Sequence, residues 1–327
     1  MRPYAEVRLL RLGAVKARGE ASVGAVVADV IYRAVKATAR RVVAEENVER
    51  IKKFRWSKSV KEAQDALIFS KDGRDWLTDD EINTLRKIYP TTYTFSESEN
   101  DGAPDFVRAK SALNALGVHG GSKNLVEIGG GPGYVAAAVA LAGHRVTCVD
   151  IRDELKSSVR DVGVKCLTAD ACSLPLPDAS VDGLWSYNCF EHIFDPYAAL
   201  KEFSRIVRPN GRIYLDFAPI YNSALGLHAF LEMGIPFLQH LLPDDRIIPQ
   251  VSSKDLWFLN RWSLDQYRKL WIDFAKILDV VRYHEGSDFQ GLELIKKYPG
   301  CFQKVSRDIN EFVTSKITVI FSVKYSC

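Results

Sequence analysis

Glu127-Ile128-Gly129-Gly130-Gly131-Pro132-Gly133 is the stretch of sequence that decides the fold. It ends a short apolar run, Asn124 to Ile128, that is typical of a buried strand, and it precedes an alanine-rich helical segment, Tyr134 to Ala142. Glycines at 129, 131 and 133 let the backbone turn tightly where a side chain would occupy the space of a ligand. A strand, a glycine-rich turn and a helix in this order predict a site for a nucleotide-like group.

The residues after Asn124 alternate between β-rich runs and helical stretches. This alternation predicts crossover connections and therefore an α/β fold with a parallel sheet and helices on both faces. Such sheets bind ligands at the carboxyl ends of their strands. The predicted strands are Asn124 to Ile128, Arg145 to Asp150, Val164 to Thr168, Val181 to Ser186 and Arg212 to Phe217.

The residues around the glycine turn limit the choice of ligand. A G-x-G-x-x-G dinucleotide fingerprint beginning at Gly129 requires glycine at 134, where the chain has Tyr134, and this counts against NAD. Asp150 ends the second predicted strand about twenty residues after the glycines, where a carboxylate can accept hydrogen bonds from both ribose hydroxyls. Asp170 ends the third strand. The alternative for each aspartate is a helix N-cap or a turn.

The arrangement E-x-G-x-G-x-G at Glu127 to Gly133 resembles motif I of the class I S-adenosylmethionine-dependent methyltransferases. The run Ala169 to Asp182, followed by Asn188, Glu191-His192 and Arg208-Pro209-Asn210-Gly211, resembles the type 11 methyltransferase domain. The resemblance covers residues 124 to 219 and returns at 317 to 324 as a closing strand. It implies a Rossmann-like, mostly parallel sheet of seven strands whose last strand is antiparallel, with S-adenosylmethionine as the cofactor.

The resemblance also implies which residues bind the cofactor. Asp150 would hold the ribose, Ile151 would pack on the adenine, and Asp170 with the backbone N–H of Ala171 would read the adenine edge. Asn188 would border the cofactor. The full predicted cofactor site is Glu127, Gly129, Gly131, Gly133, Asp150, Ile151, Asp170, Ala171 and Asn188.

Methyl transfer from a sulfonium is a direct displacement, so the protein must align the acceptor and, for a hydroxyl, remove its proton. His192, just after the fourth predicted strand, is the candidate base, which would contribute about 10²–10⁴-fold to the rate. His228 is a second candidate base or acceptor contact. A structural histidine at a helix end is the alternative for His192, and Glu191 is expected to cap the following helix or orient a loop. No metal site is predicted, because the six histidines are scattered and lack an acidic pair at ligand spacing.

Four segments are predicted along the chain. Residues 1–110 form a helical N-terminal region, 111–220 the S-adenosylmethionine-binding domain, 221–310 a lid insertion after the fifth strand with a return helix and strand, and 311–327 the closing strand. Within the first segment, apolar spacing predicts an amphipathic helix from Ser22 to about Val43. Further helices are predicted over Val60 to Phe69 and Asp79 to Tyr89, followed by a loop from Thr91 to Pro104.

The predicted lid is rich in aromatic residues, whose faces suit sugars, planar rings or cationic groups. The alternative is a small core of the lid itself, and we favour this for Trp271 and Phe274. The stretches Tyr221 to His228 and Leu259 to Ser263 resemble a subgroup associated with sugar, polysaccharide or lipid-linked acceptors. The aromatic and histidine residues of this segment are Tyr221, His228, Phe230, Phe237, His240, Trp257, Phe258, Trp262, Tyr267 and Trp271.

Composition adds weaker constraints. A formal net charge of +3 over 327 residues argues against nucleic acid as a partner. The six cysteines show no C-x-x-C spacing, so reduced thiols and a cytoplasmic location are predicted. No uncharged run approaches the roughly 18 residues of a membrane span. The helix over 22–43 is expected to pack on the main domain, with membrane-surface association as the alternative.

These observations favour an O-methyltransferase that acts on a hydroxyl of a small-molecule or glycan-like acceptor. N- or C-methylation is the alternative within the same enzyme class. A non-catalytic, cofactor-binding scaffold that works through its N-terminal helices is the alternative of another class. The sequence makes no prediction of the oligomeric state.

Overall fold

The computed structural model describes residues 57–91, 103–229, 232–251 and 259–325 of the chain. The chain divides into two compact units, Met1–Ser57 and Lys58–Cys327, and all the strands and the cavity described below belong to the second. The helix predicted from Ser22 to Val43 lies outside the described residues, as do Phe230, Trp257 and Phe258.

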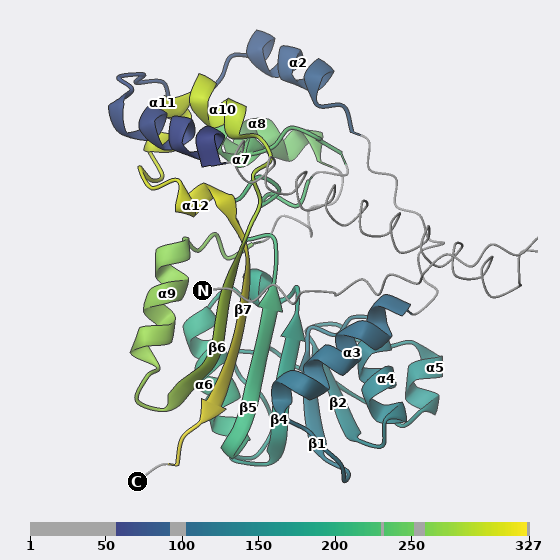
Figure 1. The fold of residues 1–327 in the computed structure, drawn as a ribbon. Coiled ribbons are helices and arrows are strands. Elements are labelled where there is room, and N and C mark those ends of the chain that lie inside the picture. The colour runs from purple at the N-terminus through teal and green to yellow at the C-terminus, as the bar shows by residue number, and fades with distance from the viewer. Residues whose placement is uncertain (1–56, 92–102, 230–231, 252–258, 326–327) are drawn as a thin grey trace, which may run out of the picture. The chain divides into compact units, whose positions relative to one another are not determined.

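A seven-stranded sheet with the order β3-β2-β1-β4-β5-β7-β6 forms the framework of this unit (Figure 1). The first five strands pair in parallel, while β7 pairs antiparallel with both β5 and β6. This confirms the predicted seven-stranded, mostly parallel sheet with a reversed closing strand. The strands are β1 Asn124–Ile128, β2 Arg145–Asp150, β3 Lys165–Thr168, β4 Val181–Tyr187, β5 Val207–Phe217, β6 Leu278–Ser287 and β7 Thr314–Val323.

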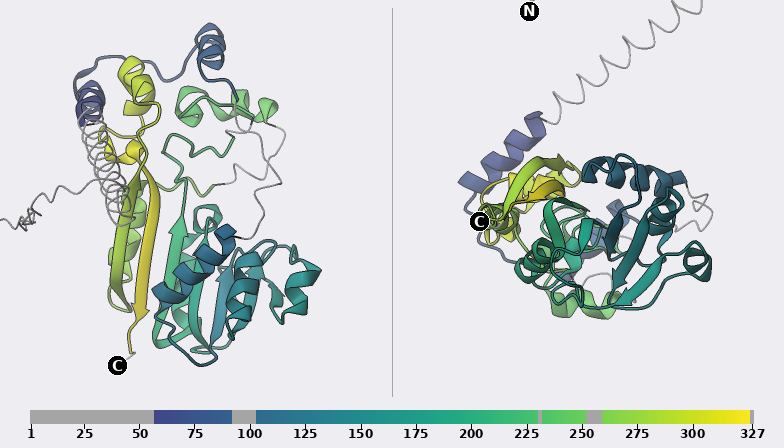
Figure 2. Two further views of the ribbon diagram at one scale, coloured as in Figure 1. Left: turned by 45° about the vertical axis from the view of Figure 1, so that its right-hand side comes forward. Right: turned by 90° about the horizontal axis from the view of Figure 1, so that it is seen from below.

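Helices cover both faces of the sheet (Figure 2). Apolar side chains of α3, α4 and α5 form one core against the sheet, and those of α6 and α9 form a second core on the opposite face. Each face therefore buries its own apolar layer, as an α/β sandwich requires. The helices are α3 Ala103–Leu116, α4 Tyr134–Leu141, α5 Ser157–Asp161, α6 Pro196–Ile206 and α9 Leu264–Asp273.

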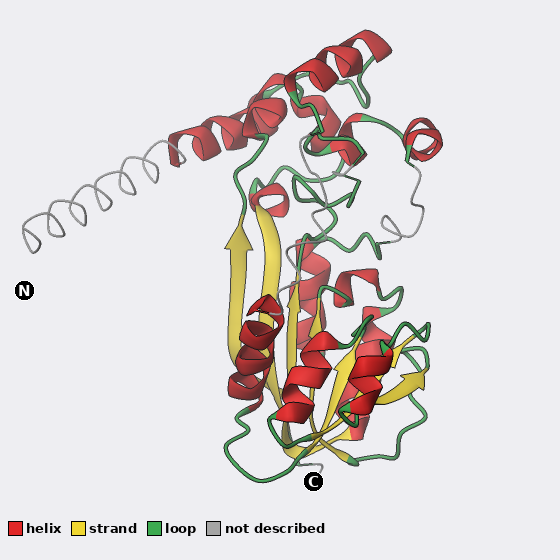
Figure 3. Ribbon diagram, turned by 90° about the vertical axis from the view of Figure 1, so that its right-hand side faces the viewer, coloured by secondary structure: helices red, strands yellow, loops and turns green. Residues whose placement is uncertain are grey.

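A third core belongs to a helical cap, which we define as residues 57–91, 220–229, 232–251 and 292–313. The cap lies beyond the end of the sheet at which β4 and β5 finish (Figure 3). Leu67 and Leu85 from the N-terminal part pack in one cluster with Phe237 and Phe302 from the later parts. The cap helices are a helix over 57–69, α2 Asp79–Ile88, α7 Leu238–Leu241, α8 Asp244–Ile247, η3 Ile248–Gln250, α10 Leu292–Lys297, α11 Pro299–Gln303 and α12 Asn310–Val313.

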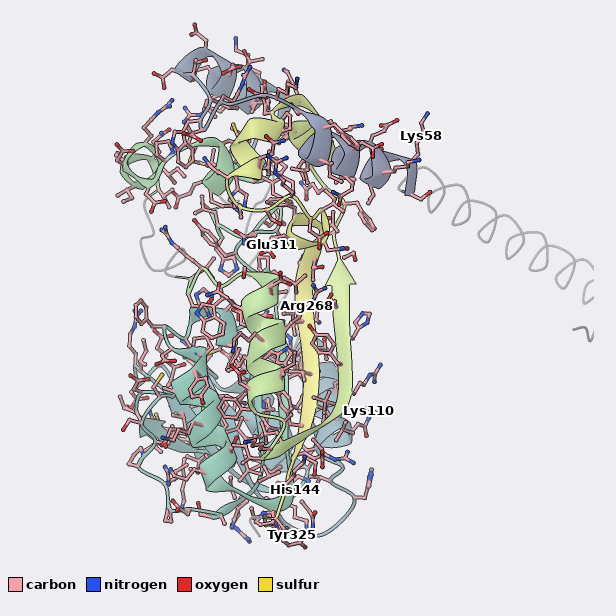
Figure 4. The ribbon with its side chains drawn as sticks, turned by 90° about the vertical axis from the view of Figure 1, so that its left-hand side faces the viewer. Lys58, Lys110, His144, Arg268, Glu311 and Tyr325 are labelled. Atoms are coloured by element: carbon pink, nitrogen blue, oxygen red, sulfur yellow. The ribbon has the colours of Figure 1, made fainter. Side chains whose placement is uncertain are left out.

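Helix α9 corrects one detail of the sequence analysis. Trp271 and Phe274, which we expected in a lid core, lie on or at the end of α9 and are buried in the core between that helix and the sheet. Apolar residues repeat along one face of α9, and this face packs on the sheet. Helix α9 and strand β6 lie within residues 221–310, the segment for which a return helix and strand were predicted, and Arg268 of α9 pairs with Glu285 of β6 at 2.8 Å (Figure 4).

Glu311, which precedes β7, connects the cap to the sheet layer (Figure 4). Its buried carboxylate accepts hydrogen bonds from the Leu264 backbone N–H at 3.0 Å and from Asn222 Nδ2 at 2.6 Å. One side chain therefore fixes both the start of α9 and the chain after β5. Burial raises the pKa of Glu311, an effect that these hydrogen bonds oppose.

The five cysteines in the described part of the chain are free thiols: Cys148, Cys166, Cys172, Cys189 and Cys301. Among the helices of the described residues, none is both long enough and apolar enough to span a bilayer.

Candidate active site

The glycine loop joins β1 to α4 through backbone conformations that favour glycine. Gly129, Gly131 and Gly133 have φ values of 69°, 49° and 84°. A Cβ at Gly129 would overlap the Cys189 side chain, and one at Gly133 would overlap Leu155, whereas one at Gly131 would meet no atom within 4 Å. Packing within the protein therefore requires glycine at positions 129 and 133. The sequence analysis had attributed these glycines to the space needed by a ligand.

A cavity of about 540 Å³ lies at the carboxyl ends of the parallel strands, beside this loop. Its volume falls within the range of about 300–1,000 Å³ that is typical of small-molecule sites. The predicted residues that line it are Gly129, Asp150, Ile151, Asp170, Ala171, Asn188 and His192. Lining residues that the sequence analysis did not single out include Cys172, Cys189 and Phe194.

The two strand-end aspartates also stabilise their own loops. Asp150 Oδ2 accepts a hydrogen bond from the Gly131 N–H at 3.1 Å, which joins the second strand end to the glycine loop. Asp170 Oδ1 accepts one from the Cys172 N–H at 2.8 Å, so the turn-forming role considered for Asp170 is present while the residue lines the cavity. Ile151 is 66% exposed at the cavity, where a flat ring could cover it.

Glu127 lies behind the glycine loop rather than among the residues that line the cavity. Its carboxylate accepts a hydrogen bond from Trp185 Nε1 at 3.0 Å and is 3% exposed. A Cβ on Gly130 would come within 2.9 Å of Glu127 Oε2, which shows how closely the loop covers it. Burial raises the pKa of Glu127 to about 7. Direct cofactor contacts by Glu127, Gly131 and Gly133 stay predictions.

Glu127→Gln is expected to stabilise the fold more at pH 8 than at pH 5. The folded state holds the Glu127 proton up to about pH 7, whereas the unfolded state releases it near the ordinary value of 4.5. The free energy of unfolding of the parent protein therefore falls as pH rises from about 4.5 to about 7, by an amount on the order of 1–3 kcal/mol. Glutamine keeps an oxygen for Trp185 and carries no charge. Urea unfolding of both proteins at the two pH values measures the difference, and an equal effect at both would contradict the assignment.

Two histidines that are distant in sequence meet beside the cavity. His192 ends the short helix η2 Phe190–His192 after β4, and its backbone N–H donates to the Cys189 carbonyl at 2.8 Å. His228 comes from the chain after β5 and has a left-handed backbone with φ of 59°. The centroids of the two imidazole rings lie 4.9 Å apart with an interplanar angle of 57°. The fold thus brings both candidate bases to one place.

Glu191 does not cap the following helix, which was one of the two roles predicted for it. The cap of α6 is Asp195, whose side chain accepts from the Ala198 N–H at 3.0 Å. Glu191 is 1% exposed, and its carboxylate lies beside the two histidines, with one oxygen and one nitrogen from each ring within 4.8 Å of one another. Burial raises the pKa of Glu191 to about 8. Its backbone carbonyl accepts from the Asn260 N–H, so the residue also holds the loop before α9.

Residues 126–215 contain the glycine loop, both strand-end aspartates and the Glu191-His192 pair, and they match the family model described as a methyltransferase domain. Residues 126–215 form a methyltransferase domain. The match confirms the predicted methyltransferase domain, and a relative that shares it is described as S-adenosylmethionine-dependent, in agreement with the predicted cofactor. The matched residues run from β1 into β5 and include all the residues that line the cavity.

Relatives of known sequence match the same part of the chain. An uncharacterized methyltransferase of Mycobacterium sp. strain JLS is 34% identical over 136 residues, which cover 41% of this chain and 51% of the relative. A probable S-adenosylmethionine-dependent methyltransferase of Mycobacterium tuberculosis H37Rv is 33% identical, over 38% and 48% of the two chains. The 27-O-demethylrifamycin SV methyltransferase of Amycolatopsis mediterranei is 32% identical, over 33% and 43%. The chain spans about half the length of these relatives.

Proposed function

We propose that this chain transfers the methyl group of S-adenosylmethionine to a hydroxyl oxygen of a small-molecule or glycan-like acceptor. One observation carries the proposal: Asp150, Asp170 and His192 line the same cavity, and His228 lies directly beside His192. Carboxylates suited to a ribose and an adenine edge thus share a space with imidazoles suited to a hydroxyl.

Each part of the cavity has a role in the proposed reaction. The Asp150 carboxylate accepts hydrogen bonds from the ribose hydroxyls, and Asp170 with the Ala171 N–H binds the adenine edge, while Ile151 covers the ring. S-adenosylmethionine supplies an electrophilic methyl carbon on a positively charged sulfur. His192 holds the acceptor hydroxyl in line with that carbon and accepts its proton as the oxygen attacks.

Two observations support oxygen as the methylated atom. The Amycolatopsis mediterranei relative is named for methylation at an oxygen of a rifamycin. The imidazole pair favours oxygen over nitrogen, since a neutral amine attacks without first losing a proton. N- or C-methylation remains the alternative, and a cofactor-binding scaffold is the alternative of another class.

The proposal is tested by calorimetry and by methyl transfer with the purified full chain. We expect micromolar binding of S-adenosylhomocysteine, and transfer of labelled methyl from S-adenosylmethionine to members of a panel of phenols and sugar alcohols. Labelling of amines or carbon acids alone would replace the oxygen assignment by the alternative. Binding without transfer to any acceptor would favour the scaffold, and absence of binding would overturn the proposal.

A further inference from the structure

Glu191, His192 and His228 bring three groups that can ligate a metal to one point beside the cavity. One carboxylate oxygen and one nitrogen from each imidazole lie within 4.8 Å of one another. Around an ion with bonds of about 2.1 Å, two ligand atoms lie about 3.4–4.2 Å apart, so modest side-chain rotations complete the set. The sequence predicted no metal site because its histidines are scattered, but the fold joins residues from the ends of β4 and β5.

The state of the Glu191 side chain supplies an independent observation. The residue is 1% exposed, and neither carboxylate oxygen completes a hydrogen bond with any group in the described residues. The backbone N–H groups of Glu191 and Ala218 lie near the carboxylate and favour its charged form, but their geometry falls outside that of a hydrogen bond. A buried carboxylate without a partner is costly, and a cation is one of the few groups that compensate it.

We propose that Glu191, His192 and His228 bind a divalent transition-metal cation at the acceptor side of the cavity. Two imidazoles and one carboxylate form a donor set that suits zinc or iron(II) and leaves coordination positions open. Magnesium and calcium prefer sites composed entirely of oxygen ligands. Because His192 also lines the cavity, a cation held by this residue would lie beside the space proposed for the acceptor.

The consequence for the reaction rests on the proposed function. A bound cation would lower the pKa of an acceptor hydroxyl beside it, so that the hydroxyl could lose its proton to water. The oxyanion then attacks the methyl carbon, and the carbon–sulfur electron pair passes to the sulfur. His192 acts as a ligand in the loaded protein, and the cation takes over the activation that the imidazole provides without metal.

Titration of the chelator-treated full chain with Zn²⁺ by calorimetry tests the site without reference to turnover. We expect one ion per chain, with visible absorption on replacement by Co²⁺. Glu191→Gln and His228→Ala should each weaken Zn²⁺ binding by at least about 100-fold, since even partners in the outer shell of a metal site contribute about 10–100-fold. His119→Ala, at an exposed histidine outside the cavity, is the matched control and should bind Zn²⁺ like the parent.

S-adenosylhomocysteine titration of the same proteins separates the two proposals. The parent and both site variants should keep their affinity for this ligand, which shows that they are folded. Zn²⁺ binding that is absent in the parent, or undiminished in both variants, would overturn the metal site while leaving the proposed function intact. If the parent does not bind S-adenosylhomocysteine, the proposed function is overturned. The Zn²⁺ titrations would then still show whether the metal site exists.

Discussion

Asp150→Ala is expected to raise the dissociation constant for S-adenosylhomocysteine by about 10²–10³-fold, because it removes two charge-assisted hydrogen bonds to the ribose. The same change removes the acceptor of the Gly131 N–H, so the glycine loop also loses its connection to the end of β2. Calorimetric titration of the parent and variant measures the effect directly and requires no knowledge of the acceptor.

Two further variants sharpen this experiment. Asp161→Ala removes an exposed carboxylate at the end of α5, outside the cavity, and should leave binding unchanged. Asp150→Asn keeps the size of the side chain and one acceptor oxygen, so its affinity should fall between those of the parent and Asp150→Ala. An Asp150→Ala protein that is folded and binds as tightly as the Asp161→Ala control would show that the ribose does not lie at this strand end.

His192→Ala is expected to lower kcat by about 10²–10⁴-fold, the range that a positioned acid or base contributes. The side chain is lost whether the imidazole acts as a base or as a metal ligand, so the direction of the effect is the same in both cases. S-adenosylhomocysteine affinity should change little, since the strand-end aspartates are retained. Steady-state methyl transfer to whichever hydroxylated acceptor emerges from the panel gives kcat.

The control for this variant is again His119→Ala, which should keep the kcat of the parent. The pH dependence of kcat provides a second readout. Loss of a proton-accepting group changes the shape of the curve of kcat against pH as well as the maximum value of kcat. A His192→Ala protein with nearly full turnover would exclude both proposed roles for His192 in proton removal.

The first five strands and the strand-end aspartates that line the cavity were predictable because their signals are local. The glycine turn, the strand before it and the aspartate that ends the next strand lie within one short span, and the bounds of β1 and β2 match the prediction at both ends. Asp150 and Asp170 line the cavity because parallel strands bring their carboxyl ends to one edge, whatever lies between them.

The acceptor side depended on contacts that leave no local signal. His192 and His228 were each singled out, but their pairing follows from the path of the chain after β5. Glu191 was expected to cap the following helix or to orient a loop, and Asp195 provides the cap. Strand β6 is exposed at most positions and lies at the sheet edge, so it lacks the buried apolar alternation that identifies a strand. The core of the cap contains residues from segments more than a hundred positions apart in the sequence. The hydrophobic periodicity of each segment does not predict that these segments pack together.

A crystal structure of the full chain with S-adenosylhomocysteine tests the central claim most directly. We expect the ribose hydroxyls on Asp150, the adenine beside Asp170 and Ala171, and the sulfur facing the His192–His228 pair across free space for an acceptor. A ligand bound elsewhere, or a sulfur directed away from both histidines, would contradict the assignment of this cavity as a methyl-transfer site.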